Sequence, residues 1–166
     1  MTPTEHYATV ANELCEEFED SPEWTSCQPG RWRSAISRAY YSVFLALKER
    51  LIAARPVEFS RRFPRVDVHR KVRKAVGNVL GTAPGSLANA LRALSERRTD
   101  ADYDWWSVAV RKNDVVTHLS RAKRARAKIA ALSDAQVGAI ALELVNIERE
   151  ERTKKAGERG SGLTER

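Results

Sequence analysis

Histidine and arginine are the side chains of this sequence best suited to chemistry on phosphate esters, because imidazole moves protons near neutral pH and guanidinium stabilises negative charge. Two of the three histidines follow an arginine by seven residues: Arg62 precedes His69, and Arg111 precedes His118. On a helix, this separation places Arg111 and His118 on one face. Chance alone predicts about one such pair in a chain so rich in arginine, so the spacing by itself assigns no role to either pair.

The charge of the chain is unevenly distributed. Before Arg31 there are seven acidic residues and no Lys or Arg, whereas the remainder holds 29 basic residues against 15 acidic ones. A field of this sign attracts nucleic acid, although it equally suits an acidic partner protein or simply keeps the chain soluble. The basic runs 61–74 and 111–128 are the candidate phosphate-binding surface, with a solvated face as the alternative. The residues that we expect to contact RNA in these runs are Arg62, Arg65, Arg70, Arg73, Lys112 and Asn113.

Several function classes receive no support from the composition. Cys15 and Cys27 form neither a CxxC pair nor a zinc-ligand spacing, so we expect no metal and no disulfide framework. The sequence contains no glycine-rich phosphate-binding loop, so it does not suggest a cofactor. The chain shows no apolar signal core and no run of the roughly 18 apolar residues that span a bilayer, and we therefore expect a cytoplasmic protein.

Apolar residues recur at helical spacing through most of the chain, and no stretch alternates as a strand does. Ser86 is a predicted N-cap, and Ser133 with Gln136 a predicted capping box. The pattern predicts an all-α, up-and-down bundle of about five to six helices over residues 1–149. Residues 150–166 are charged and nearly free of apolar side chains, so we expect a disordered tail there. The expected helices are 3–19, 31–54, 66–80, 87–98, 105–131 and 134–149.

Two stretches carry a family resemblance. Residues 33–44 contain Ser-Arg-Ala-Tyr-Tyr, and residues 94–104 contain Arg-x-x-Ala-Asp-Tyr. Together they resemble a prokaryotic branch of the HEPN superfamily over about residues 5–130, and His69 lies where that branch often has a histidine opening its third helix. The resemblance implies a bundle of four or five helices, usually dimeric, and many such proteins are ribonucleases or ribonuclease toxins of defence systems.

The resemblance also implies a chemistry. In active members an arginine is followed after four to six residues by a histidine, and no metal is needed: the RNA 2′-hydroxyl attacks the adjacent phosphate, histidine moves protons and arginine stabilises the developing charge. This sequence departs from the pattern, because no histidine follows Arg98 at that distance. The candidate catalytic pairs are therefore Arg98 with His69, reached across a dimer, and Arg111 with His118. For His69 alone, helix capping or a simple hydrogen bond is the alternative.

Three further side chains have both a functional and a structural interpretation. Arg38 and Tyr41 face away from the apolar stripe of their helix, so they either line a polar groove or pair with a carboxylate such as Asp102, and we favour the pairing. Tyr103 either stacks on a base of RNA, or is a modification target as the resembling tyrosine is, or packs over the end of the bundle, which we favour.

Two functions from different classes remain open. The first is an RNA-directed protein, either a metal-independent endoribonuclease or the toxin component of a defence or toxin–antitoxin system, whose partner would be an antitoxin or a nucleotidyltransferase. The second is a non-catalytic dimeric scaffold that binds a partner protein, suggested by the missing histidine after Arg98. Binding of a small nucleotide has weaker support, since no phosphate-cradling loop is visible.

Overall fold

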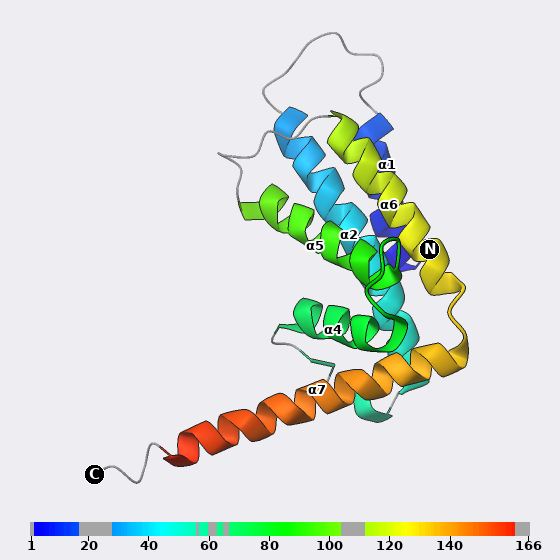
Figure 1. Cartoon of the computed structure of the whole chain (residues 1–166). Coiled ribbons are helices and arrows are strands. Elements are labelled where there is room, and N and C mark those ends of the chain that lie inside the picture. Colours follow the sequence, from blue (N-terminus) through cyan, green and yellow to red (C-terminus); the bar gives the residue numbers. More distant parts are fainter. Residues whose placement is uncertain are drawn as a thin grey trace.

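The computed structural model describes residues 2–16, 28–55, 57–59, 63–64, 67–103 and 112–161, and these residues are almost entirely helical (Figure 1). No strand occurs among them, which confirms the predicted all-α fold. The helices are α1 (Pro3–Glu16), α2 (Gln28–Ala54), α4 (Val68–Leu80), α5 (Leu87–Tyr103), α6 (Lys112–Ala130) and α7 (Asp134–Ser161).

Helix α2 is the centre of the bundle. It packs against α1, α5, α6 and α7, while α4 packs against α5 and α7 (Figure 1). The short connection at 131–133 turns the chain by 104° between α6 and α7, so that α7 crosses beneath α4 and its far end extends away from the other helices.

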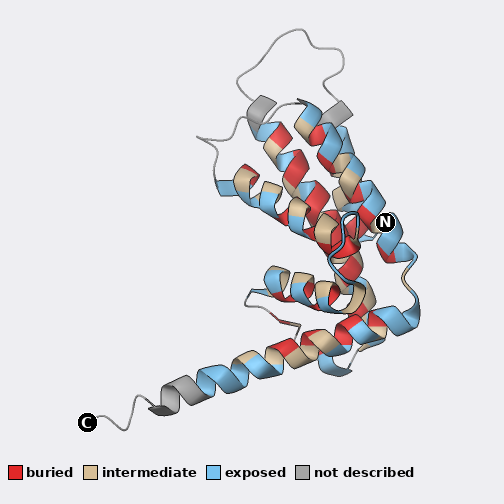
Figure 2. Ribbon diagram, in the orientation of Figure 1, coloured by how far each residue is buried: buried red, intermediate tan, exposed pale blue. Residues whose placement is uncertain are grey.

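The sequence of α2 explains its central position. Ala39, Val43, Leu47 and Leu51 recur at intervals of four and are at most 1% exposed, as a helix needs to bury one face. Figure 2 shows the corresponding buried stripe along the helix. Burying each of the larger aliphatic side chains stabilises the fold by about 1.5–3 kcal/mol, so the stripe holds together the helices that surround α2.

The predicted helix starts at Ser86 and Ser133 are confirmed. Ser86 Oγ accepts a hydrogen bond of 3.2 Å from the Asn89 amide. At the start of α7 the Gln136 amide donates to Ser133 Oγ at 3.2 Å, and the Ser133 amide donates to Gln136 Oε1 at 2.9 Å. This reciprocal arrangement is a capping box, which satisfies two amides that the helix itself leaves without partners.

Two predicted helix ends are wrong, and electrostatic contacts explain both. Helix α5 continues past residue 98 to Tyr103, where Arg98 pairs with Asp102 one turn later. Helix α7 continues to Ser161, so the first twelve residues of the expected disordered tail are helical. Beyond 149 the helix is stabilised by ion pairs to α4 rather than by an apolar face. The 105–111 part of the expected helix 105–131 lies outside the described residues.

A buried lysine fastens α7 to α4. Lys71 is 4% exposed, and its Nζ lies 2.5 Å from Glu148 Oε2 and 3.1 Å from Glu151 Oε2. Burial acts to lower the pKa of Lys71, but the hydrogen bonds that Lys71 donates to the two glutamates outweigh burial and raise the pKa above its usual value. Lys71 therefore stays charged. Since Arg70 also pairs with Glu151 at 2.7 Å, the α4–α7 contact is a network of charges.

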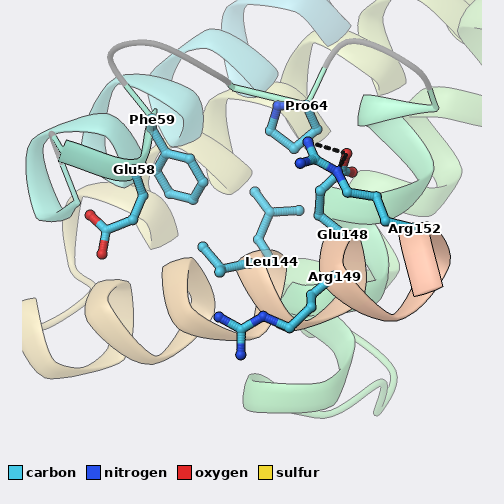
Figure 3. Close-up of a pocket in the computed structure, with 8 residues that line it drawn as sticks. Glu58, Phe59, Pro64, Leu144, Glu148, Arg149 and Arg152 are labelled. Carbon is cyan, nitrogen blue, oxygen red and sulfur yellow. Dashed lines mark hydrogen bonds and ion pairs between the residues drawn. The ribbon is translucent and has the colours of Figure 1, made fainter.

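Next to this network, a cavity of about 300 Å³ lies between α7 and the residues Glu58, Phe59 and Pro64 (Figure 3). Phe59, Pro64 and Leu144 form its apolar wall, and the ion pair between Glu148 and Arg152 closes one edge. The described residues that line the cavity include no histidine, serine or cysteine, so we assign them to the packing of α7 rather than to chemistry.

Leu144 and Leu142 give a matched test of how α7 is held. Leu144 is completely buried, whereas Leu142 on the same helix is 46% exposed. We expect Leu144→Ala to lower the free energy of unfolding by about 2–5 kcal/mol, because it leaves a cavity, and Leu142→Ala to change it by about 0.5 kcal/mol or less. Urea denaturation followed by circular dichroism measures both values. Equal losses in the two variants would contradict this packing of α7.

Candidate functional site

Three helices bring together a group of polar side chains that we call the His69 cluster: Tyr40 and Tyr41 of α2, His69 of α4, and Arg98 and Asp102 of α5. Helix α5 packs along α2 and α4 packs against α5, and His69 in the first turn of α4 contacts Tyr40 and Phe44 of α2. The consecutive tyrosines therefore reach two neighbours at once, Tyr40 towards His69 and Tyr41 towards Arg98.

His69 lies in an aromatic environment. Its Nδ1 forms a hydrogen bond of 2.7 Å with the Tyr40 hydroxyl, and its ring centroid is 4.3 Å from that of Phe44 and 6.0 Å from that of Tyr41. Burial lowers the pKa of His69, and the charges of Arg98 and Arg73 lower it further. The imidazole is therefore neutral at pH 7, the form in which histidine accepts a proton.

Tyr40 keeps its proton as well. Burial raises the pKa of its hydroxyl to about 12, with Ser95 and nearby arginines opposing the shift. The hydrogen bond between Tyr40 and His69 thus joins two neutral groups, and it leaves His69 Nε2 without a partner among the described residues. This arrangement fixes the ring and leaves one nitrogen for a ligand.

Arg98 is held from three sides. Its Nη2 donates a hydrogen bond of 3.0 Å to the Tyr41 hydroxyl, and its Nε lies 2.6 Å from Asp102 Oδ2. The guanidinium carbon is 5.4 Å from the ring centroid of Tyr41 and 5.6 Å from that of Tyr103, within the range of cation–π attraction. The side chain is only 17% exposed, so the guanidinium is oriented before any ligand arrives.

The sequence had suggested that His69 meets Arg98 across a dimer, but the structure brings them together within one chain. Tyr41 links them, since its hydroxyl binds Arg98 and its ring contacts His69. The sequence interpretation missed this role of Tyr40 and Tyr41. The signal for it was the pair of adjacent tyrosines, whose side chains point about 100° apart on a helix and can serve two neighbouring helices.

The favoured pairing of Arg38 with Asp102 is wrong. Asp102 binds Arg98, and the Arg38 guanidinium lies over the Tyr7 ring of α1, 5.0 Å from its centroid. Tyr7 in turn contacts Tyr41, with 6.1 Å between ring centroids. Arg38 is exposed, so it places a cation at the edge of the His69 cluster.

Tyr103 does not pack over the end of the bundle, because it is 71% exposed. An aromatic ring this exposed, stacked on one side by the Arg98 guanidinium, leaves its other face to solvent. Such a ring is suited to stacking on an unpaired base.

Comparisons with family models, with curated proteins and with solved structures gave no match. The described residues contain no group of three side chains suited to hold a metal ion. Among them, no single helix is long and apolar enough to cross a membrane, and only the bent pair 113–130 and 134–156 satisfies the criteria of length and composition when taken together.

The residues predicted to contact RNA fall into different groups in the structure. Arg73 lies near His69, whose pKa its charge lowers, but Arg70 is engaged by Glu151 and Asp67. Asn113 is exposed at the start of α6. The remaining members, Arg62, Arg65, the side chain of Lys112 and the catalytic candidate Arg111, lie outside the described residues.

His118 is buried between α5 and α6, at the wall of a cavity of about 300 Å³ that Arg97 and Arg121 also line. It is 3% exposed, and its Nε2 has no hydrogen-bond partner among the described residues. Burial lowers the pKa of His118 to about 4, although a hydrogen bond with the Leu94 backbone opposes the shift. The charged groups that act on it are Arg121, Arg97 and Asp114 rather than Arg98. His118 therefore belongs to the packing of α6 and not to the His69 cluster.

Acid should unfold the protein through His118. Its pKa is depressed on folding, so the unfolded chain binds the proton first, and the stability present above pH 6.5 is lost as the pH falls towards 4. The loss attributable to this group is ~3 kcal/mol. In His118→Gln we expect a much flatter dependence, measured as the free energy of unfolding in urea at pH 7, 6, 5 and 4. His6→Gln, which changes an exposed histidine, is the control; identical slopes in H118Q and the unmodified protein would contradict the burial.

Proposed function

We propose that the protein is an RNA-directed, HEPN-like, metal-independent endoribonuclease that acts in the cytoplasm as a homodimer, as the toxin component of a defence or toxin–antitoxin system. The observation that carries the proposal is the His69 cluster, in which a neutral imidazole and an oriented guanidinium share the same pair of tyrosines. In this cluster His69 of α4 lies near Arg98, although no histidine follows Arg98 in the sequence within four to six residues.

The chemistry follows from the two side chains. In the tautomer that acts as a base, His69 Nδ1–H donates to the Tyr40 oxygen, and the Nε2 lone pair takes the proton of an RNA 2′-hydroxyl. The 2′-oxygen then bonds to phosphorus, the bond from phosphorus to the 5′-oxygen breaks, and His69 returns the proton to that leaving oxygen. Arg98 stabilises the charge on the non-bridging oxygens. The products are a 2′,3′-cyclic phosphate and a 5′-hydroxyl.

The surroundings of the cluster suit a single strand. Arg73 and Arg38 place positive charge at its edges, where the backbone of RNA would lie. The exposed ring of Tyr103 offers a platform for one base. A double helix does not present unstacked bases, so we propose an unpaired region as the substrate.

The alternative is a non-catalytic dimeric scaffold that binds a partner protein, such as an antitoxin or a nucleotidyltransferase, and one contact favours it. The carboxylate of Asp102 lies 2.6 Å from Arg98 Nε, and this negative charge offsets the positive charge that a phosphate would need. In a scaffold, the cluster would serve only to fasten α5 to α2. The two functions differ in the effect of Asp102→Asn, which raises RNA affinity if Arg98 binds phosphate and leaves it unchanged if Arg98 is structural.

Cleavage of single-stranded RNA in EDTA is the direct test. We expect the purified protein to produce 2′,3′-cyclic phosphate ends, and His69→Ala to lower the rate by about 10²–10⁴-fold, because it removes the group that moves the proton. Arg98→Ala should be similarly impaired. His118→Gln, which alters a histidine outside the cluster, should cleave at the normal rate. No cleavage by the unmodified protein, or equal rates in H69A and H118Q, would favour the scaffold.

Tyr103 gives a test that does not depend on cleavage. Tyr103→Ala should weaken binding of a 2′-deoxy-substituted oligonucleotide by about 1–3 kcal/mol, the usual contribution of one stacked base, whereas Tyr103→Phe should bind normally. Fluorescence anisotropy at several salt concentrations measures the affinity, and the salt slope should be the same in both variants since no phosphate contact changes. A loss in Y103F equal to that in Y103A would exclude stacking as the cause.

A further inference from the structure

Helix α4 lies between the His69 cluster and α7. It packs against α7 and α5, and Figure 1 shows α7 crossing beneath it. Its first turn carries both His69 and Lys71, and the two side chains point about 200° apart, since each residue of a helix adds about 100°. His69 thus meets Tyr40 of α2. Lys71 meets Glu148 and Glu151 of α7. One helical turn therefore joins the proposed base to the charges of α7.

The contacts of His69 with α2 are not enough to fix this turn. They include the hydrogen bond to the Tyr40 hydroxyl and ring contacts with Tyr40, Tyr41 and Phe44. A hydrogen bond between neutral groups contributes little net stability, because both groups also bind water in the unfolded chain. The place of the imidazole therefore depends on what holds the rest of α4.

The start of α4 has little support from its own cap. Asp67, the residue before the helix, has a φ of 52°, in the left-handed region where a residue with a side chain is strained. Its carboxylate makes no capping hydrogen bond within the described part of the chain and instead lies 3.4 Å from Arg70 Nη2. Arg70 in turn lies 2.7 Å from Glu151. Both charged neighbours of His69 in this turn, Arg70 and Lys71, are therefore held by α7.

Lys71 makes this dependence on α7 strong, because its charge is buried. Both of its carboxylate partners, Glu148 and Glu151, belong to α7. Removing the partners of a buried charge is strongly destabilising, since the charge is then neither hydrated nor paired. Without the glutamates Lys71 regains water by moving out from between α4 and α7, and the helical turn that carries His69 moves with it.

We propose that Glu148 and Glu151 position His69: by holding the Lys71 ammonium, they keep the first turn of α4 against α2 and the imidazole against Tyr40. They are positioning residues, because they act through Lys71 rather than on the RNA. Helix α7 thus controls whether the His69 cluster is assembled. The catalytic consequence rests on the proposed function, but the placement of His69 is measured without RNA.

Removal of both glutamate charges tests this role in the full chain. Glu148→Met combined with Glu151→Met keeps side chains of similar length over Lys71 but removes its partners. We expect the His69 imidazole to leave its buried place, so that its pKa, which burial and the nearby arginines lower, rises towards the ordinary value. Nitrogen NMR of the histidine-labelled protein measures this pKa, and the resonance of His118, buried between α5 and α6, should not change.

Two further variants show whether the effect passes through Lys71. Adding Lys71→Met to E148M/E151M leaves an apolar layer with no buried charge, which is often as stable as the ion pairs that it replaces, so the pKa of His69 should be low again. Glu150→Met, which changes an exposed glutamate of the same helix, should leave His69 in place. In RNA cleavage, kcat of E148M/E151M should fall about tenfold or more, because a base misplaced by about 1 Å acts poorly. KM should stay constant, and the Lys71→Met triple variant should regain the normal kcat.

The resonance of His118 separates a local change from unfolding. If it moves in E148M/E151M, Glu151→Gln takes the place of that variant: it leaves Lys71 one glutamate, and we expect a smaller rise in the pKa of His69 with His118 unchanged. A pKa of His69 that stays low in both variants, a rise that Lys71→Met does not reverse, or a rise always shared with His118 would overturn the positioning role. These shifts in a protein that cleaves no RNA would support the positioning role and remove the proposed function. Cleavage at the normal rate with His69 in place would do the reverse.

Discussion

The packing of α5 against α2, with α4 packed in turn against α5, is the constraint on which the rest of the structure depends. It places His69 and Arg98, which are 29 residues apart in the chain, against the adjacent side chains Tyr40 and Tyr41. The buried stripe of α2 fixes where the tyrosines lie, because Tyr40 is itself 1% exposed and belongs to the core. The candidate site is thus built into the core, and its side chains are oriented by packing rather than by a flexible loop.

The role of each arginine and lysine in this chain depends on whether a carboxylate pairs with it. Lys71 and Arg70 fasten α7, and Arg98 is bound by Asp102. Lys71 and Arg70 position a helix and contribute little to an attractive field, while Asp102 offsets part of the charge of Arg98. Lys123 and Arg126 have no ion pair among the described residues, and Arg38 lies over a neutral ring. Positive charge in the sequence therefore overstates the surface on which phosphate can bind, and the paired and unpaired cations have to be distinguished one by one.

Much of the fold could be predicted from the sequence. Apolar residues that recur three and four positions apart predicted helix α2, and the capping residues Ser86 and Ser133 predicted the starts of two others. The structure confirms these helices. The ends of α5 and α7 could not be predicted in full, because part of what holds them lies on another helix. Arg33 of α2 donates to the Asp100 and Ala101 carbonyls of α5, and Glu148 and Glu151 of α7 meet α4 only after folding. A charged segment without apolar residues looks disordered until the opposite charges on another helix are known.

The candidate site was only partly predictable. His69, Arg98 and Tyr103 could be named from their types and from the resemblance, but their proximity within one chain depends on how helices cross, which spacing along the chain does not determine. The same limitation applies to His118, which its spacing from Arg111 predicted to face a substrate but which is 3% exposed. Periodicity along the chain cannot distinguish an exposed histidine from a buried one.

The central claim is that an RNA phosphate is bound between His69 and Arg98, and side-chain nitrogen NMR tests it most directly. A single-stranded oligonucleotide with a 2′-deoxy substitution, which cannot be cleaved there, is added to the protein labelled at histidine and arginine. The account predicts that the His69 and Arg98 resonances move, and that the pKa of His69 rises because a phosphate now lies beside it, while His118 is unchanged. Resonances of His69 and Arg98 that stay in place under saturating oligonucleotide would contradict the account.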